Sequence, residues 1–220
     1  KTKALKLNEN IKTRDQITVL GYPLGGQTIS TTTGIVSRIE YKSYVWSNEY
    51  LLAIQVDAAI NSGNSGGAAI DKNGDLVGIA MMRLTNADNI SYIVPSVIIN
   101  TFLEDIKDGK VDGFGEDGLT VNYIRNDSVK DYFGLHDDKG ILITKVEYGV
   151  EDFKENDILL EIDDKVIAND ATIDSKFGRV NCTLLLHQKQ IGETIKVKVL
   201  RDKKEIAFTH TIQRLNPLIK

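Results

Sequence analysis

The chain has 220 residues and a formal net charge of −4, with 41% hydrophobic and 26% charged residues. This composition is ordinary for a globular protein, and the length suffices for two small domains. The acidic balance excludes the basic footprint of a nucleic-acid-binding protein, and no apolar run approaches the roughly 20 residues that a membrane-spanning helix needs. The single cysteine, Cys182, has no partner for an internal disulfide, and its apolar neighbours predict a buried helix position.

Residues 1–94 are expected to form short strands joined by Gly, Asn and Ser turns, a pattern typical of a β-barrel. One strand is predicted at residues 16–20, after a polar turn that contains Asp15. Further along, the apolar residues 68–70 and 76–82 enclose the pair Asn73-Gly74. An Asn-Gly pair between two apolar runs is a strong hairpin signal.

A serine stands inside a turn with very few side chains, Asn61-Ser62-Gly63-Asn64-Ser65-Gly66-Gly67. Glycines let the backbone bend sharply and let a substrate carbonyl approach, so Ser65 is the candidate catalytic nucleophile. The backbone N–H groups of Gly63, Asn64 and Ser65 are the candidate oxyanion hole. A serine also needs a base, and the three histidines, His136, His187 and His210, all follow it in the chain.

Two unrelated types of serine hydrolase could present such a serine. The residues Gly63-Asn64-Ser65-Gly66-Gly67 satisfy the G-x-S-x-G pattern of an α/β-hydrolase elbow, which requires a long helix after the serine. A hairpin is predicted there instead, which favours an all-β hydrolase.

The second part of the chain has a different pattern. Pro95 opens a predicted helix whose apolar face, Ile99, Phe102, Leu103 and Ile106, is expected to pack against the barrel. A charged, glycine-rich stretch follows, and residues 112–214 then read as an α+β unit. Its candidate strands are 119–124, 140–146, 157–162, 193–200 and 205–213, with a helix at 180–188.

Several ordered motifs resemble the HtrA/Deg serine proteases, most closely the Deg branch of plant organelles. They are Gly21-Tyr22-Pro23-Leu24-Gly25-Gly26, Thr33-Gly34-Ile35-Val36-Ser37-Arg38-Ile39-Glu40, Gln55-Val56-Asp57-Ala58-Ala59-Ile60-Asn61 before the serine turn, Asn89-Ile90-Ser91-Tyr92-Ile93-Val94-Pro95, Ile167-Ala168-Asn169-Asp170 and Lys196-Val197-Lys198-Val199-Leu200-Arg201. The resemblance covers essentially the whole chain. It implies a mainly β protein in which the C-terminal barrel of a trypsin-like protease, with a terminal helix, precedes an α+β PDZ domain.

The implied division has four parts: residues 1–108 form the second half of the protease domain, 109–117 a linker, 118–214 the PDZ domain and 215–220 a tail. Family members carry the catalytic His and Asp on a first barrel, which is expected to lie outside this chain. Residues 4–7 would be the strand after that Asp. Asp15 and Asp57 are therefore interpreted as structural, and the three histidines as surface or groove residues.

The resemblance also implies binding sites. The specificity pocket would be formed by Ala59, Ile60, Met82 and Ile90, with Met81 beside them. No acid stands six residues before Ser65, so the pocket is expected to accept Val, Ala or Ile rather than Lys or Arg. The peptide-binding loop of the PDZ domain maps to Gly118, Leu119, Thr120 and Val121. Thr120 replaces the usual glycine, which weakens the expectation of carboxylate capture because a β-branched residue is poorly suited to a left-handed or very open backbone.

The functional prediction is an ATP-independent serine endopeptidase of protein quality control that cuts unfolded polypeptides. No cofactor, metal or nucleic acid is expected, peptide C-termini are the expected PDZ ligands, and the complete protein is expected to form a trimer-based homo-oligomer. The alternative is a peptide-binding or chaperone-like module without catalysis. Family members are periplasmic or in organelles, and residues 1–220 do not say which applies.

Two segments are expected to be loops near the serine: residues 21–26, without the Lys of a phosphate loop, and the polar residues 83–89, a candidate activity switch.

Overall fold

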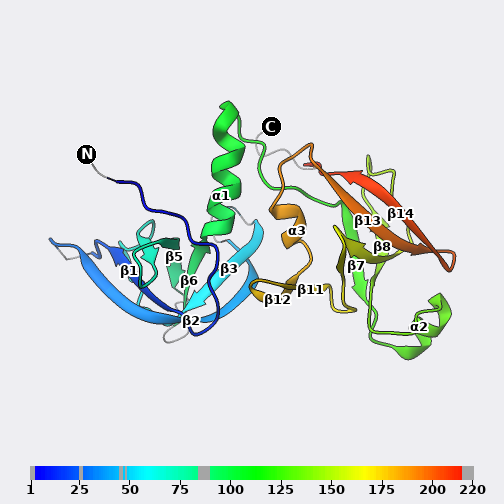
Figure 1. Ribbon diagram of the computed structural model, residues 1–220, viewed down its shortest axis with the longest axis horizontal. Helices are drawn as coiled ribbons and strands as arrows, with labels where there is room; N and C mark the ends of the chain where they lie inside the picture. The colour runs from blue at the N-terminus through cyan, green and yellow to red at the C-terminus, as the bar shows by residue number, and fades with distance from the viewer. Residues whose placement is uncertain (1–2, 25–26, 45–46, 48, 84–89, 215–220) are drawn as a thin grey trace. The chain divides into compact units, whose positions relative to one another are not determined.

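The computed structural model describes residues 3–24, 27–44, 47, 49–83 and 90–214, with only the backbone described at residues 82 and 83. The chain divides into two compact units (Figure 1). The first comprises Lys1–Leu103 with Ser175–Gly178, and the second comprises Glu104–Asp174 with Arg179–Lys220.

The first unit is a closed antiparallel barrel with the strand order β1-β2-β3-β6-β5-β4 (Figure 1, blue to green). Its strands are β1 (Gln16–Gly21), β2 (Ser30–Ser43), β3 (Tyr50–Val56), β4 (Ala68–Ile70), β5 (Leu76–Arg83) and β6 (Ser91–Pro95). The barrel closes where Thr18 and Val19 of β1 pair with Ile70 and Ala69 of β4. Closure leaves no unpaired edge, and the predicted barrel is therefore confirmed.

Alternation of apolar residues fills the barrel interior. Ile17 and Val19 of β1 are 1% exposed, and Thr18 between them is only half-buried. The strand β3 is buried on both faces over most of its length, with Leu52 and Ile54 fully covered. The predicted hairpin after the serine is confirmed as β4 and β5, and Gly74 of its turn has a φ of +82°.

One predicted strand is absent. Residues 4–7 run without regular pairing except for a bridge between Leu7 and Leu76. Since β5 already has β4 and β6 on its two sides, a single bridge at its first residue is all that this segment can add.

The helix α1 (Ser96–Asp105) forms where predicted, and the 3₁₀ turn η1 (Ile106–Asp108) follows it. The predicted packing face is wrong. The buried residues of the helix are Ser96, Val97, Ile98, Thr101 and Asp105, whereas Phe102 and Leu103 are 45% and 43% exposed. The hydroxyl of Ser96 donates to the carbonyl of Leu76, which fixes the helix start, and the polar Thr101 is tolerated inside because its hydroxyl donates to the Val97 carbonyl.

The second unit is built on a sheet with the strand order β14-β13-β9-β8-β7, to which β10 adds beside β9 (Figure 1). These strands are β7 (Leu119–Tyr123), β8 (Ile141–Val146), β9 (Ile158–Ile162), β10 (Lys165–Val166), β13 (Thr194–Arg201) and β14 (Lys204–Thr211). All five predicted strands are confirmed within a few residues. One core cluster contains Ile124, Leu135, Ile158 and Leu160.

Three further elements of this unit differ from the sequence-based expectation. The helix α2 (Asp127–Phe133) was not predicted, although Asn126 caps it by accepting from the Ser128 N–H. Strands β11 (Thr172–Ser175) and β12 (Gly178–Asn181) form a small separate sheet. The helix predicted over residues 180–188 shrinks to α3 (Leu184–His187), because Val180 belongs to β12.

The second unit also buries the cysteine and carries paired charges on its sheet. Cys182 is buried as predicted, but in the turn before α3, and burial raises the pKa of its thiol to about 12. On the sheet, Lys198 pairs with Glu161 across β13 and β9 at 2.8 Å. Within the described ranges, no helix is long and apolar enough to cross a membrane.

Candidate active site

Ser65 lies in the turn that joins β3 to β4, and two glycines give that turn its shape. Gly63 and Gly66 have φ values of +98° and +85°, in the left-handed region that residues with a Cβ rarely adopt. The Ser65 side chain is exposed to solvent. The sequence of the turn thus determines a bend that displays a hydroxyl.

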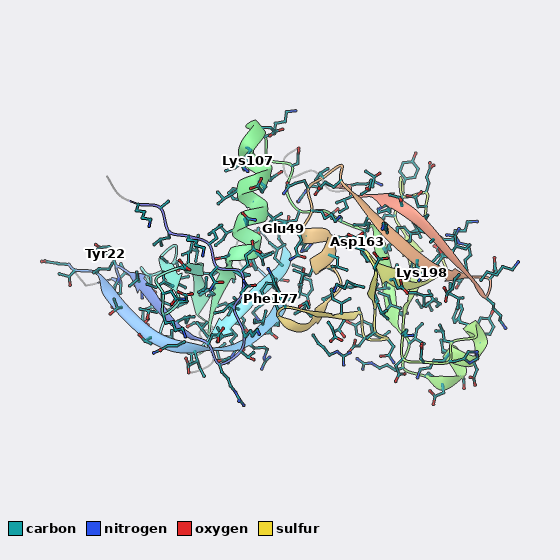
Figure 2. All side chains as sticks on the ribbon, in the orientation of Figure 1. Tyr22, Glu49, Lys107, Asp163, Phe177 and Lys198 are labelled. Carbon is teal, nitrogen blue, oxygen red and sulfur yellow. The ribbon has the colours of Figure 1, made fainter. Side chains whose placement is uncertain are left out.

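Close contact with the end of β1 adds a second requirement for glycine. A Cβ at Gly67 would lie 2.0 Å from the carbonyl oxygen of Leu20, and one at Gly63 would lie 2.6 Å from that of Tyr22. Tyr22 itself is 62% exposed (Figure 2). The serine turn therefore packs directly, backbone to backbone, on residues 20–22, and residues 21–24 form part of its support as expected of a neighbouring loop. Residues 25 and 26 lie outside the described ranges.

Hydrogen bonds fix most of the turn. The Asn64 N–H donates to the Asn61 carbonyl at 3.0 Å, the Gly66 N–H to the Ala80 carbonyl at 2.8 Å, and the Gly67 N–H to the Asn64 carbonyl at 2.9 Å. Among the described residues, no group accepts from the N–H groups of Gly63 and Ser65. Two of the three donors predicted for the oxyanion hole are therefore open, and the third, Asn64, is engaged within the turn.

The Asn64 side chain was not singled out from the sequence. It is 1% exposed, and its amide oxygen has no hydrogen-bond partner among the described residues. A Cβ at Gly21 would lie 2.6 Å from that oxygen. The side chain thus fills the space beneath the serine turn, against the backbone of β1.

The Ser65 hydroxyl donates to the carbonyl oxygen of Met81 in β5 at 3.1 Å. A carbonyl cannot take the proton, so this contact holds the side chain without activating it. All three histidines belong to the second unit. Of the histidines expected at the surface or in a groove, His136 is exposed, whereas His187 and His210 are buried, at 6% and 1% exposed.

Both buried histidines have structural surroundings. His187 lies 5.7 Å from the Phe114 ring, and burial lowers its pKa to about 4. His210 lies 2.9 Å from an Asp152 oxygen through Nδ1 and packs edge-on against Phe153.

The two aspartates of the first unit bond to nearby backbone. An Asp15 oxygen accepts from the Lys12 N–H at 2.8 Å, and an Asp57 oxygen accepts from the Ile35 N–H at 2.6 Å. These contacts agree with the structural roles predicted for both residues.

The residues predicted for the specificity pocket differ in exposure. Ala59 is exposed and its carbonyl accepts from the Thr32 hydroxyl at 2.8 Å, whereas Ile60 is 2% exposed and belongs to the barrel core. Ile90 is half-buried, and the Met82 side chain lies outside the described part of the chain, as do residues 84–89 of the predicted switch loop.

The predicted peptide-binding residues mark the start of β7. Gly118 has a φ of +65°, and Thr120 lies in the strand, outside the left-handed region. The left-handed backbone thus falls on Gly118 and not on Thr120, and weakened carboxylate capture at this loop stays a prediction. Strand β7 is the last in its sheet and pairs only with β8 among the described strands.

The barrel and the serine turn are those of a trypsin-like peptidase domain, and residues 1–79 match the family model described as the trypsin-like peptidase domain. Two Arabidopsis thaliana proteins extend the match over 98% of this chain: "Protease Do-like 4, mitochondrial" at 37% identity and "Putative protease Do-like 3, mitochondrial" at 39%. The chain covers 42% and 39% of these proteins, so it spans about two fifths of their length.

The comparison with solved structures also finds HtrA-type proteases. The structure named "HtrA-type protease AlgW with tripeptide" matches with a TM-score of 0.71 and 25% identity, over 97% of this chain and 70% of that one. The resemblance to the Deg/HtrA serine proteases is confirmed, and so is the mainly β, trypsin-like fold.

Proposed function

We propose that the protein of which this chain is part is an ATP-independent serine endopeptidase of protein quality control, which cuts unfolded polypeptides after small or aliphatic residues. The observation that carries this proposal is the serine turn. Ser65 is exposed, and the N–H groups of Gly63 and Ser65 are open beside it. A nucleophile and two oxyanion donors on one turn are two of the three parts that acyl transfer requires, and the third is a base.

The chemistry follows from that arrangement. The Ser65 oxygen attacks the scissile carbonyl carbon and its proton passes to a histidine base, which an aspartate orients. Both partners are expected outside these 220 residues. The Gly63 and Ser65 N–H groups stabilise the negative oxygen, the base then protonates the leaving amine, and water hydrolyses the acyl-enzyme. To react, Ser65 must leave the Met81 carbonyl, so the contact at 3.1 Å is a resting state.

The specificity proposal rests on the absence of an acid at position 59. Ala59, Ile60, Met82 and Ile90 offer no buried charge, so a Lys or Arg side chain would enter without a partner. A library of peptides cut by the complete protein should therefore show Val, Ala or Ile before the cleaved bond. A dominant preference for Lys or Arg would contradict the pocket.

For the second unit we propose a PDZ domain at residues 118–214, after a protease part at 1–108, a linker at 109–117 and before a tail at 215–220. Three observations support it. Strand β7 is one of the two edge strands of the described sheet, the preceding loop packs beside α3 through Phe114 and His187, and the similar HtrA-type protease AlgW was solved with a tripeptide. An extended peptide can add to such an edge as an extra strand. Unfolded polypeptides are the proposed partners, and a trimer-based homo-oligomer the proposed assembly.

A fluorophosphonate probe, which reacts with activated serines, tests the protease proposal. It should label the complete protein at Ser65, and Ser65→Ala should abolish both labelling and peptide cleavage, with a loss of at least about 10⁴-fold. Residues 1–220 alone should not label, because the base is missing. Absence of labelling in the complete protein would favour the chaperone-like module instead, and strong labelling of the isolated chain would contradict the mechanism.

A further inference from the structure

Two backbone N–H groups at the loop before β7 are engaged by the chain itself. The Glu116 N–H donates to the Gln213 carbonyl at 2.8 Å, and the Leu119 N–H donates to a carboxylate oxygen of Asp117 at 3.0 Å. In the described part of the chain, the Gly118 N–H has no acceptor. The Leu119 N–H, one of the donors that a ligand carboxylate would need, is thus already occupied by the chain itself.

The direction of the Leu119 N–H shows where the Asp117 carboxylate lies. The Gly118 carbonyl accepts from the Glu147 N–H at 2.8 Å, on the side of β8. In a trans peptide, the C=O of one residue and the N–H of the next point in opposite directions, so the Leu119 N–H points to the free edge of β7. Asp117 therefore places its negative charge at the free edge, where strand addition would bring a peptide.

The loop that carries Asp117 has little room to shift. A Cβ at Gly115 would lie 2.2 Å from Cγ2 of Ile212 and 3.8 Å from the Leu186 carbonyl of α3. Phe114 contacts the His187 ring. Burial raises the pKa of the Asp117 carboxyl and the charge of Glu116 adds to this, whereas the Leu119 N–H and His210 lower it. A ligand carboxylate bound beside Asp117 would add a second negative charge where burial already disfavours the first.

We propose that Asp117 occupies the carboxylate position of the peptide groove, so that the groove selects extended internal segments of a polypeptide over peptide ends with a free carboxylate. This inference rests on the proposed peptide-binding function of the second unit, and it replaces C-terminal peptides as the expected ligands. An unfolded chain offers many internal segments and a single C-terminus. Asp117 thereby directs the groove to the part of a substrate that is most abundant.

The test measures binding of residues 1–220 to fluorescent peptides of one apolar sequence in three forms: with a free C-terminal carboxylate, with a C-terminal amide, and extended by several residues past that end. The amide and the extended peptide should bind about tenfold more tightly than the free carboxylate, since like charges brought together at an interface are costly. Asp117→Asn keeps an oxygen for the Leu119 N–H and removes only the charge. It should tighten binding of the free-carboxylate peptide and leave the amide unchanged.

Asp112→Asn is the matched control, because it removes an exposed acid from the same segment. It should leave the tenfold difference intact. Asp117→Ala removes both charge and acceptor, and it should favour the free carboxylate further. Preference of the unaltered chain for the free carboxylate, or no effect of Asp117→Asn, would overturn the inference while peptide binding stands. Failure of all three peptides to bind would overturn the peptide-binding function and the inference with it.

Discussion

The serine turn and the loop before β7 share one backbone arrangement but differ in whether its N–H groups are occupied. Each places a positive-φ glycine beside backbone N–H groups, at Gly63 and at Gly118. In the serine turn the N–H groups of Gly63 and Ser65 have no acceptor among the described residues, whereas the Leu119 N–H is filled by the Asp117 carboxylate. Open N–H donors can stabilise a negative charge that forms only during the reaction. A donor that is already occupied fits a site that does not bind a ligand with a permanent negative charge.

The largest effect, on both stability and labelling, is expected from a substitution in the serine turn. Gly67→Ala places a Cβ 2.0 Å from the Leu20 carbonyl, so β1 and the turn must separate. We expect the free energy of unfolding of the first unit to fall by about 3 kcal/mol. We also expect probe labelling of the complete protein to slow by about 100-fold, because misplaced groups lose rate steeply.

Gly66→Ala is the control for this change. Its Cβ would meet no atom within 4 Å, although its φ is +85°. It should cost about 1 kcal/mol from backbone strain alone. Equal effects of the two substitutions would show that packing on β1 does not hold the turn open.

The second largest effect is expected in the core of the second unit and should leave the serine turn unchanged. Arg201 forms a bidentate ion pair with Asp157, 2.7 Å on each arm, and Asp157 is 1% exposed. Arg201→Met should leave a buried carboxylate without its cation and lower the unfolding free energy of the second unit by about 3–5 kcal/mol. Lys198→Met, which breaks the more exposed pair with Glu161, should cost less than about 1 kcal/mol.

Probe labelling of Ser65 in the complete protein is the companion measurement for Arg201→Met. It should stay unchanged, since the barrel has its own closed core. A parallel loss of labelling would mean that the open turn depends on the second unit.

The smallest expected effect is a pH-dependent change in stability at the loop before β7. The pKa of Asp117 is raised, chiefly by burial, so the folded chain binds its proton more readily than the unfolded chain. The cost of Asp117 to stability is therefore full above its folded-state pKa, shrinks as the pH falls below that pKa, and is gone once the pH is below the unfolded-state pKa. Asp117→Asn should raise the thermal midpoint near neutral pH and lose this advantage in mild acid. A constant difference at all pH values, or the same profile for Asp112→Asn, would contradict the origin of the effect in Asp117.

Much of the fold could be predicted from local pattern. The turn Asn73-Gly74, the strand β1 and the strands of the second unit were each predicted correctly, because these signals act over a few residues. The face of α1 could not be predicted in this way. Its apolar spacing points to Phe102 and Leu103, but the Ser96 contact and the buried Val97 and Ile98 orient the other face inward.

The same holds for the candidate site. The serine, the glycines that bend around it and the lack of a histidine before it could all be predicted in advance, since each is a matter of residue type and order. Three features became visible only in the folded chain: the Asn64 N–H donates to Asn61, Ser65 rests on Met81, and Asp117 fills the Leu119 N–H. These contacts depend on which way a peptide unit or a side chain points in space, and residue order alone does not fix that direction.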